Sequence, residues 1–219
     1  MFDDNGCLNK RYGVIVADCP WQYNDMKNND PAMGGFRYPP MTLSKLANLE
    51  IKNIAKPDCA LFMWATMPML NEALYVINSW GFVYTTCAFV WVKLNKNGKA
   101  YKHPIITERD VLLVNGVYSG LGHWQNSNVE LCLFAKRGKP KRLQRNVKQI
   151  LFAPVGKHSS KPDEANERIE RLIDDTDRIE LFARKYREGW DATGLDLDGR
   201  YIEDVLPTDN ASVGLQEAF

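Results

Sequence analysis

The sequence has few of the residues that build metal sites or disulfide frameworks. It holds three histidines, none of them four residues from another, and five widely spaced cysteines without a C-x-x-C pair. These spacings argue against a zinc knuckle, a histidine-built metal site and a set of paired disulfides. We therefore expect reduced thiols and no bound metal.

Long apolar runs are also missing. No hydrophobic stretch reaches the roughly 18 residues that mark a membrane span. The first thirteen residues, MFDDNGCLNKRYG, lack the apolar core of a secretory signal. The sequence therefore predicts a cytoplasmic protein that does not associate with a membrane.

The chain has almost no net charge, +1 at pH 7, but the charges are unevenly distributed. An acidic stretch over residues 162–180 carries eight acids and three bases. The opposite case is the basic run KRGKPKRLQRNVK, residues 136–148, which carries no acid. Such a run suits a polyanion such as nucleic acid, although a solvated loop explains it equally well. Its seven basic residues are Lys136, Arg137, Lys139, Lys141, Arg142, Arg145 and Lys148.

Short apolar runs alternate with helical patterns along the chain, which indicates the α/β class. One helix is expected over residues 67–81, and another begins at Pro162 with acids in its first turn. We expect one domain over residues 1–205 and a loosely held tail over 206–219. The expected strands are Tyr12–Ala17, Ala60–Ala65, Val83–Val92, Glu130–Ala135, Gln149–Ala153 and Arg178–Ala183.

Two long segments, 22–41 and 95–128, show neither a helical nor a strand pattern. Loops of this length in a compact domain are typical of binding segments and lids. We therefore expect both to border a substrate site.

The residues ADCPWQY directly follow the first expected strand. Asp18 would lie at the carboxyl end of that strand, where open α/β sheets place their ligand sites. The exocyclic amine of a nucleobase is a poor nucleophile, because its lone pair is delocalised into the ring. A carboxylate and a backbone carbonyl that accept its two N–H bonds would make it reactive, and an aromatic face would hold the ring.

The tetrapeptide DCPW supplies these groups. Asp18 offers the carboxylate and Cys19 its main-chain oxygen. Pro20 turns the chain, and Trp21 offers a flat stacking surface. The structural alternative is a strand-ending turn in which Trp21 packs into the core.

Six ordered blocks then give the sequence its resemblance to the MT-A70 family of S-adenosylmethionine-dependent N6-adenine methyltransferases. They cover residues 12 to about 202, and DCPW differs by one residue from the family's DPPW. The resemblance implies a methyltransferase domain with a Rossmann-like fold, a mostly parallel twisted sheet flanked by helices, in the β-class order of motifs. The blocks are ADCPWQY, LFMWATMPML…ALYVINSWGF, FVWVK, GLGHWQNSNVELCLFAKRGKP, SSKPDEANERIERL and DRIELFARKYREGWDATGLDLDG.

The resemblance also implies roles for single residues. Asp18 to Trp21 would form the catalytic motif, and Lys161 would bind the carboxylate of S-adenosylmethionine at a helix start, where backbone N–H groups favour anions. Glu180 would reach the cofactor's ribose, as carboxylates do in dinucleotide folds. The expected cofactor-binding residues are Asp18, Lys161, Glu180, Arg184 and Arg187. The expected substrate-binding residues are Tyr23, Trp124, Asn126, Glu130, Lys136, Arg137, Lys139, Lys141 and Arg142.

The chain departs from the family pattern at three places. Cys19 replaces a proline, which leaves the main-chain carbonyl in place, so we expect activity to survive. Tyr186-Arg187 stand for a His-Asn pair, and Leu195-Asp196 for an Asn-Gln pair, so the cofactor contacts at those positions differ from the family's.

Three other functions stay open at this point. Cys19 would be a nucleophile in a cytosine C5-methyltransferase, but the Pro-Cys order of those enzymes is reversed here and no activating cation is adjacent. A non-catalytic, methyltransferase-like subunit would only hold nucleic acid, whereas the retained Asp18 and Lys161 favour catalysis. The same amine chemistry also serves N4 of cytosine.

DNA is the expected substrate by analogy with small prokaryotic or phage-type enzymes, and RNA is the alternative. The setting would then be the cytoplasm of a bacterial or phage-type host cell. A homodimer or a methyltransferase-like partner also fits this interpretation.

Overall fold

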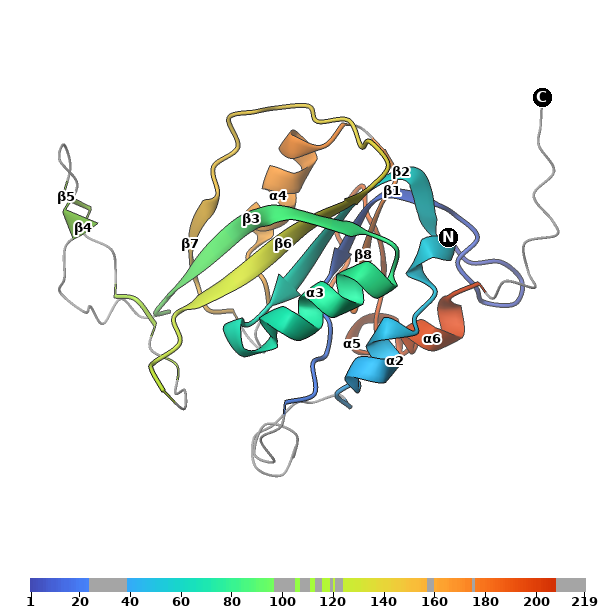
Figure 1. Ribbon diagram of the computed structural model, residues 1–219, viewed down its shortest axis with the longest axis horizontal. Helices are drawn as coiled ribbons and strands as arrows, with labels where there is room; N and C mark the ends of the chain where they lie inside the picture. The colour runs from blue at the N-terminus through green and yellow to red at the C-terminus, as the bar shows by residue number, and fades with distance from the viewer. Residues whose placement is uncertain are drawn as a thin grey trace.

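A computed structural model gives the architecture of the chain (Figure 1). It describes residues 1–23, 39–96, 105–106, 111–112, 116–118, 120, 124–156, 160–174 and 176–207. Most of the two expected loops, all three histidines and nearly all of the expected tail lie outside the described residues.

The described residues form a twisted seven-stranded sheet in the order β7-β3-β6-β2-β1-β8-β9. Neighbouring strands are parallel except around β6, which is antiparallel to both β2 and β3. The predicted mostly parallel sheet is therefore confirmed, with one reversed strand. The strands are β1 (Tyr12–Ala17), β2 (Ala55–Ala65), β3 (Val83–Leu94), β6 (Val129–Arg137), β7 (Ile150–Pro154), β8 (Arg178–Leu181) and β9 (Asp191–Thr193), and a separate pair is β4 (Ile105–Ile106) with β5 (Val111–Leu112).

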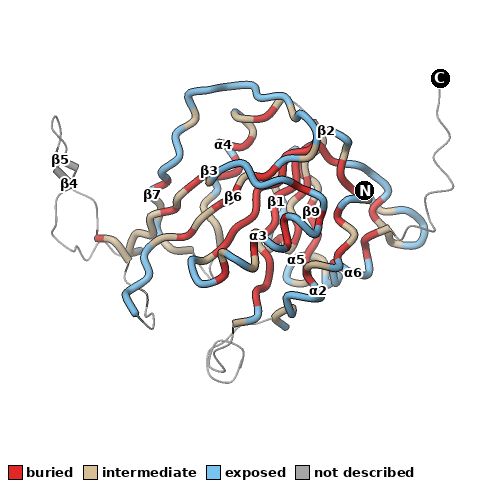
Figure 2. Tube along the Cα trace, viewed as in Figure 1, coloured by how far each residue is buried: buried red, intermediate tan, exposed pale blue. Residues whose placement is uncertain are grey.

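Helices cover both faces of the sheet (Figure 1). In β2, Leu61 and Met63 pack into the core on the α3 side, and Phe62 and Trp64 into the core on the α4 side. This alternation is the period of two expected of a strand. The last seven residues of β2 are all buried, as expected where both faces of a sheet are covered (Figure 2). The Rossmann-like fold is thereby confirmed. The helices are α2 (Leu43–Ala47), α3 (Leu70–Ser79), α4 (Asp163–Leu172), α5 (Leu195–Asp198) and α6 (Ile202–Val205), with 3₁₀ turns at Ile51–Asn53 and Met67–Met69.

Several details differ from the sequence prediction. The strand expected over 178–183 ends at Leu181, because Phe182 takes a left-handed conformation with φ 58°. Pro162 is the N-cap of α4 instead of its first residue, since its ψ of 134° is extended. The short elements β9, α2, α5 and α6 were not expected, because three to five residues are too few to show a hydrophobic period.

The directions of the strands decide which side chains meet. β1, β2 and β8 end at one edge of the sheet, and the reversed β6 begins there, with Ala65 of β2 paired to Leu131 of β6. At the opposite edge, Cys59 of β2 is paired to Arg137. The beginning of β6 therefore lies at the same edge as the end of β1, with β2 between them, and the last residues of β6 lie at the far edge. None of the described helices is long and apolar enough to span a membrane.

Candidate active site

Asp18 follows β1 directly, at the edge where β1, β2 and β8 end. All six residues of β1 are buried, so the position of Asp18 is set by a strand packed on both sides. Pro20 then turns the chain, and its carbonyl oxygen accepts a hydrogen bond from the Met41 backbone N–H at 2.8 Å. The structure places Asp18 at a strand end, as the sequence indicates.

Lys161 reaches Asp18 from the residue before the N-cap of α4. Its Nζ lies 2.7 Å from Asp18 Oδ1 and 2.9 Å from Glu130 Oε1, and it lies 5.7 Å from the centre of the Trp64 ring. Burial alone would lower the pKa of Lys161, but the two carboxylates raise it well above its ordinary value. Lys161 therefore stays positively charged at neutral pH.

Glu130, the second residue of β6, is 5% exposed and shared between two lysines. Oε1 contacts Lys161, and Oε2 lies 2.8 Å from Nζ of Lys93 at the end of β3. Burial raises the pKa of Glu130, but Lys161 and Lys93 outweigh burial and hold it below its ordinary value of 4.5. The result is a row of alternating charges, Lys93, Glu130, Lys161 and Asp18, which we call the charge row.

Two further expected cofactor residues lie on the β8 side of the charge row. Glu180 pairs with Val16 across β8 and β1, and its carboxylate accepts a hydrogen bond from the Asn166 side chain of α4 at 3.1 Å. Burial raises the pKa of Glu180, and Asn166 opposes this only in part. Arg184 Nη2 lies 3.9 Å from Asp18 Oδ2. Residues separated by up to 166 positions are thus brought to one edge of the sheet.

Arg187 occupies a different place from the other expected cofactor residues. Its Nη2 lies 2.6 Å from Asp163 Oδ1 in the first turn of α4, and Lys185 contacts the same carboxylate. Arg187 therefore joins the turn after β8 to α4. Its contact with a cofactor stays a prediction.

Trp21 packs inside the protein. It is 5% exposed, and its indole N–H donates to the carbonyl oxygen of Trp64 at 3.3 Å. The carbonyl oxygen of Cys19 accepts the backbone N–H of Trp21 at 2.9 Å, and a carbonyl oxygen keeps a second lone pair for a ligand. A stacking role for Trp21 stays a prediction, and in this conformation the ring belongs to the core.

Cys19 is buried, and burial raises the pKa of its thiol well above the ordinary value. A protonated thiol is a poor nucleophile, so the burial of Cys19 argues against the cysteine mechanism of C5-methyltransferases. We expect Cys19→Ala to retain most of the methyl-transfer rate, because only the main-chain oxygen is needed at this position. Steady-state kinetics test this. Complete loss of turnover in a variant with the wild-type melting temperature would restore the thiol to the mechanism.

The expected substrate residues divide into two groups around the site. Tyr23 lies close to the charge row, and its hydroxyl forms a hydrogen bond with the hydroxyl of Thr66 at 2.7 Å. Trp124 and Asn126 are exposed to solvent before β6 begins. A role of these three residues in binding the target base stays a prediction.

The basic run lies at the opposite edge of the sheet from Asp18. The six residues from Glu130 to Lys136 along β6 span roughly 20 Å. Beyond β6 the run crosses over the end of α4, where Lys141 forms an ion pair with Asp174 at 2.7 Å (Figure 1). The start of the basic run is thus far from the charge row, and contact with a nucleic-acid backbone stays a prediction for Lys136, Arg137, Lys139, Lys141 and Arg142.

A cavity of about 100 Å³, open to solvent, adjoins Pro20 of the DCPW motif. Sequence reasoning missed it, because its walls come from four separate stretches of the chain. One wall includes Gly194 and Phe182, the residue with the left-handed backbone. An added Cβ at Gly194 would clash with the Ala183 backbone. The lining residues are Pro20, Pro39, Pro40, Met41, Lys45, Phe182, Gly194, Leu195, Asp196, Arg200, Tyr201, Ile202 and Glu203. Among the described residues, no group of three or more acidic, histidine or cysteine side chains is arranged to hold a metal ion.

Comparisons with known proteins agree with this geometry. The MT-A70 family model matches residues 12–196. The Type II methyltransferase M.MunI of Mycoplasma sp is 33% identical over 217 residues, which cover 91% of this chain and 82% of that protein. The N(6)-adenosine-methyltransferase catalytic subunit METTL3 of Homo sapiens is 29% identical over 197 residues, which cover 89% of this chain but only 30% of that protein. The N(6)-adenosine-methyltransferase MT-A70-like of Arabidopsis thaliana is 29% identical over 89% of this chain and 25% of its own length.

Proposed function

The chain belongs to the MT-A70 family, and from this premise we propose that it transfers a methyl group from S-adenosylmethionine to the N6 amine of adenine in DNA. The observation that carries the proposal is Asp18. A carboxylate stands at the end of a buried strand, with one oxygen held by Lys161 at 2.7 Å. Its other oxygen, Oδ2, lies 3.9 Å from Arg184, a distance too long for a hydrogen bond, so Oδ2 is placed to accept an N–H of the amine.

The remaining groups complete the chemistry at the amine. The carbonyl oxygen of Cys19 accepts the second N–H through its other lone pair. As the amine nitrogen attacks the methyl group, the nitrogen gains positive charge. The negatively charged carboxylate of Asp18 beside it stabilises this positive charge and accepts a proton from the nitrogen. The bound cofactor supplies the electrophilic methyl group.

The residues present fit S-adenosylmethionine. Lys161 offers a largely buried positive charge beside the start of α4, which suits the cofactor's carboxylate. The largely apolar lining of the cavity next to Pro20 suits the adenosine part. Glu180 would bind the ribose hydroxyls, with Arg184 beside it and Arg187 supporting α4.

DNA is favoured because this chain covers most of a Type II methyltransferase and less than a third of METTL3. RNA is the alternative, since METTL3 is named for adenosine methylation. A base in a duplex must be flipped out to reach a carboxylate at a sheet edge. We propose that the chain acts as a homodimer or with a methyltransferase-like partner, in the cytoplasm of a bacterial or phage-type host cell.

Incubation with methyl-labelled S-adenosylmethionine and separate pools of DNA and RNA tests the proposal. After hydrolysis, the label should appear in N6-methyldeoxyadenosine. Label in N6-methyladenosine would make RNA the substrate, and label in N4-methyldeoxycytidine would change the target base. No label in any pool, with nucleic acid still bound, would identify a non-catalytic subunit.

Lys161 should control cofactor affinity. Lys161→Met removes a charge-assisted bond to the cofactor's carboxylate, worth about 1.5–3 kcal/mol, so the dissociation constant for S-adenosylmethionine should rise roughly tenfold to a hundredfold. Titration calorimetry measures it. Lys10→Met is the control, because Lys10 forms its ion pairs with Asp177 and Asp191 at the opposite edge of the sheet. Equal affinity in wild type and the Lys161 variant would remove Lys161 from the cofactor site.

A further inference from the structure

One face of the sheet carries apolar side chains that neither core of the described residues covers. In the edge strand β7, Leu151 packs into the core on the α4 side, so Ile150 and Phe152 on either side of it point to the α3 side. Ile150 is 51% exposed and Phe152 is 38% exposed. A strand with a solvated face normally carries polar residues there, so these two side chains indicate a face that a partner covers.

The neighbouring strand β3 continues this apolar face. Trp91 belongs to the core on the α4 side, so Val90 and Val92 on either side of it point to the α3 side. Strand pairing places Val90 beside Ile150 and Val92 beside Phe152. All four residues stay outside both hydrophobic cores of the described residues. Together with the flanking residues of the same face they form what we call the open face: Val90, Val92, Leu94, Val129, Ile150, Phe152 and Pro154.

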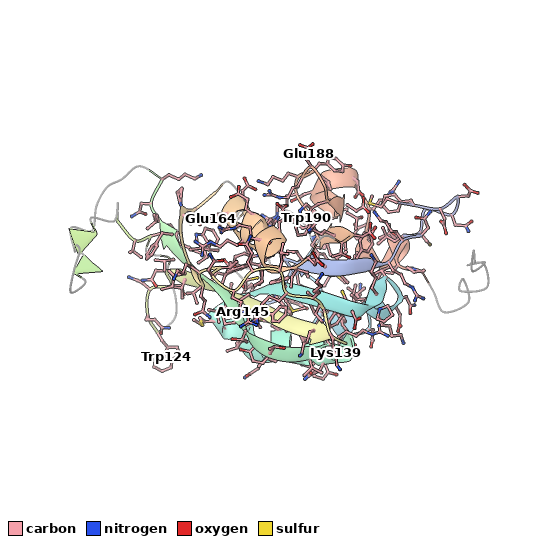
Figure 3. The ribbon with its side chains drawn as sticks, turned by 90° about the horizontal axis from the view of Figure 1, so that it is seen from above. Trp124, Lys139, Arg145, Glu164, Glu188 and Trp190 are labelled. Carbon is pink, nitrogen blue, oxygen red and sulfur yellow. The ribbon has the colours of Figure 1, made fainter. Side chains whose placement is uncertain are left out.

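The arrangement of the helices explains why this face is open. A helix is about 10 Å wide and strands lie about 4.8 Å apart, so one helix covers about two strands of a sheet. Figure 1 shows α3 in front of the middle of the sheet, and no described helix in front of β7. Seen from above, Glu164 marks α4 on the other side of the sheet (Figure 3). The described helices therefore cover β7 on one face only.

The open face contains no charged side chain. Lys93 lies between two of its members in β3, but its side chain points to the other side of the sheet, where it pairs with Glu130 at 2.8 Å. In a two-fold dimer a patch meets its own copy, so a charge at its centre would face a like charge. An uncharged patch meets its own copy without such repulsion. A partner of different sequence is instead selected by opposite charges across the contact, and the open face offers none.

The residues around the open face complete the pattern of an interface. Asn128, Lys148 and Gln149, which precede β6 and β7, are exposed and polar. An apolar centre with a polar rim is the usual anatomy of a contact between two proteins. Such a contact buries roughly 800 Å² on each partner, so the open face would be its centre and the polar residues its rim.

We propose that the open face is the contact between two copies of this chain, related by a two-fold axis. Val90, Val92, Ile150 and Phe152 of one copy pack against the same residues of the other. This inference selects the homodimer from the two assemblies in the proposed function. It concerns the free protein, so it does not depend on methyl transfer. The contact also covers the strand that carries Lys93, and thereby fixes one end of the charge row.

Sedimentation equilibrium of the full chain without nucleic acid tests the proposal. Wild type should be a dimer at micromolar concentration. Ile150→Asp should raise the dissociation constant of the dimer at least about a hundredfold, because each copy brings a carboxylate into an apolar contact. Leu143→Asp is the matched control, since Leu143 is 53% exposed but lies beside the end of α4, where its backbone N–H donates to Leu172. The control should dimerise like wild type.

A charge-swap experiment identifies the partner as a second copy. Ile150→Asp and Ile150→Lys should each be monomeric, and a mixture of the two should form a heterodimer because opposite charges then meet. A heterodimer also shows that both variants are folded. Phe152→Asp and Phe152→Lys repeat the experiment at the neighbouring position.

The outcomes separate this inference from the proposed function. A wild-type chain that stays monomeric at every concentration would overturn the inference, and so would a dimer that survives both Ile150→Asp and Phe152→Asp. Variants that keep the wild-type melting temperature but stay monomeric when mixed would overturn the two-fold contact. None of these results bears on methyl transfer to DNA. A dimer disrupted at the open face, in a protein that transfers no methyl group, would uphold the inference while the proposed function fails.

Discussion

Asp18→Asn should lower the rate of methyl transfer by about 10²–10⁴-fold, the usual contribution of a positioned acid-base group. The amide keeps the size of the side chain but loses the negative charge that stabilises the developing cation at N6. It also presents N–H groups in competition with the amine. Single-turnover kinetics with labelled S-adenosylmethionine measure the chemical step apart from product release.

The structure predicts that this loss is confined to the chemical step. Asparagine can still contact Lys161, and Lys161 keeps its ion pair with Glu130 at 2.9 Å. Cofactor affinity and melting temperature should therefore stay close to wild type. Asp204→Asn, which changes an exposed carboxylate on α6, is the matched control and should be fully active. Turnover of the Asp18 variant within a fewfold of wild type would remove Asp18 from the chemistry.

The sequence predicted those features that depend on local pattern. The bounds of β1 agree with the apolar run Tyr12–Ala17, so the place of Asp18 at a strand end was predictable. The buried face of α4, with Ala165 and Ile169, follows from the 3.6-residue period of its apolar positions. Family motifs added the assignment of Lys161.

Contacts between side chains on different strands could not be predicted from local sequence pattern. Lys93 and Glu130 are separated by 37 positions, and they meet only because β6 runs antiparallel to β3. Nothing in the apolar pattern of a strand states its direction in the sheet. For the same reason the sequence did not show that the basic run begins far from Asp18, because the reversed β6 carries Lys136 to the far edge. The cavity walls are likewise assembled by tertiary packing of separate segments.

Glu130→Gln should destabilise the protein more than any other change at the charge row. The carboxylate of Glu130 is only 5% exposed and forms ion pairs with two lysines. Removing one member of a buried ion pair leaves a charge without its partner, which lowers the free energy of unfolding by about 3–5 kcal/mol. Urea unfolding at pH 7 measures this loss. Adding Lys93→Met to the variant should recover part of the stability, because among the described residues the ion pair of Lys93 is with Glu130.

The pH dependence of stability distinguishes this ion-pair role from simple packing. The pKa of Glu130 is lower in the folded state than its ordinary value of 4.5, so its contribution is present above that pH. It is lost as the pH falls through the lowered pKa and the folded carboxylate takes up a proton. The stability difference between wild type and Glu130→Gln should therefore be largest near neutral pH and shrink below about pH 4.5. A difference that is constant from pH 7 to pH 3 would mean that Glu130 stabilises the fold by packing alone, and Lys161 would then be held in place by Asp18 instead of by the whole charge row.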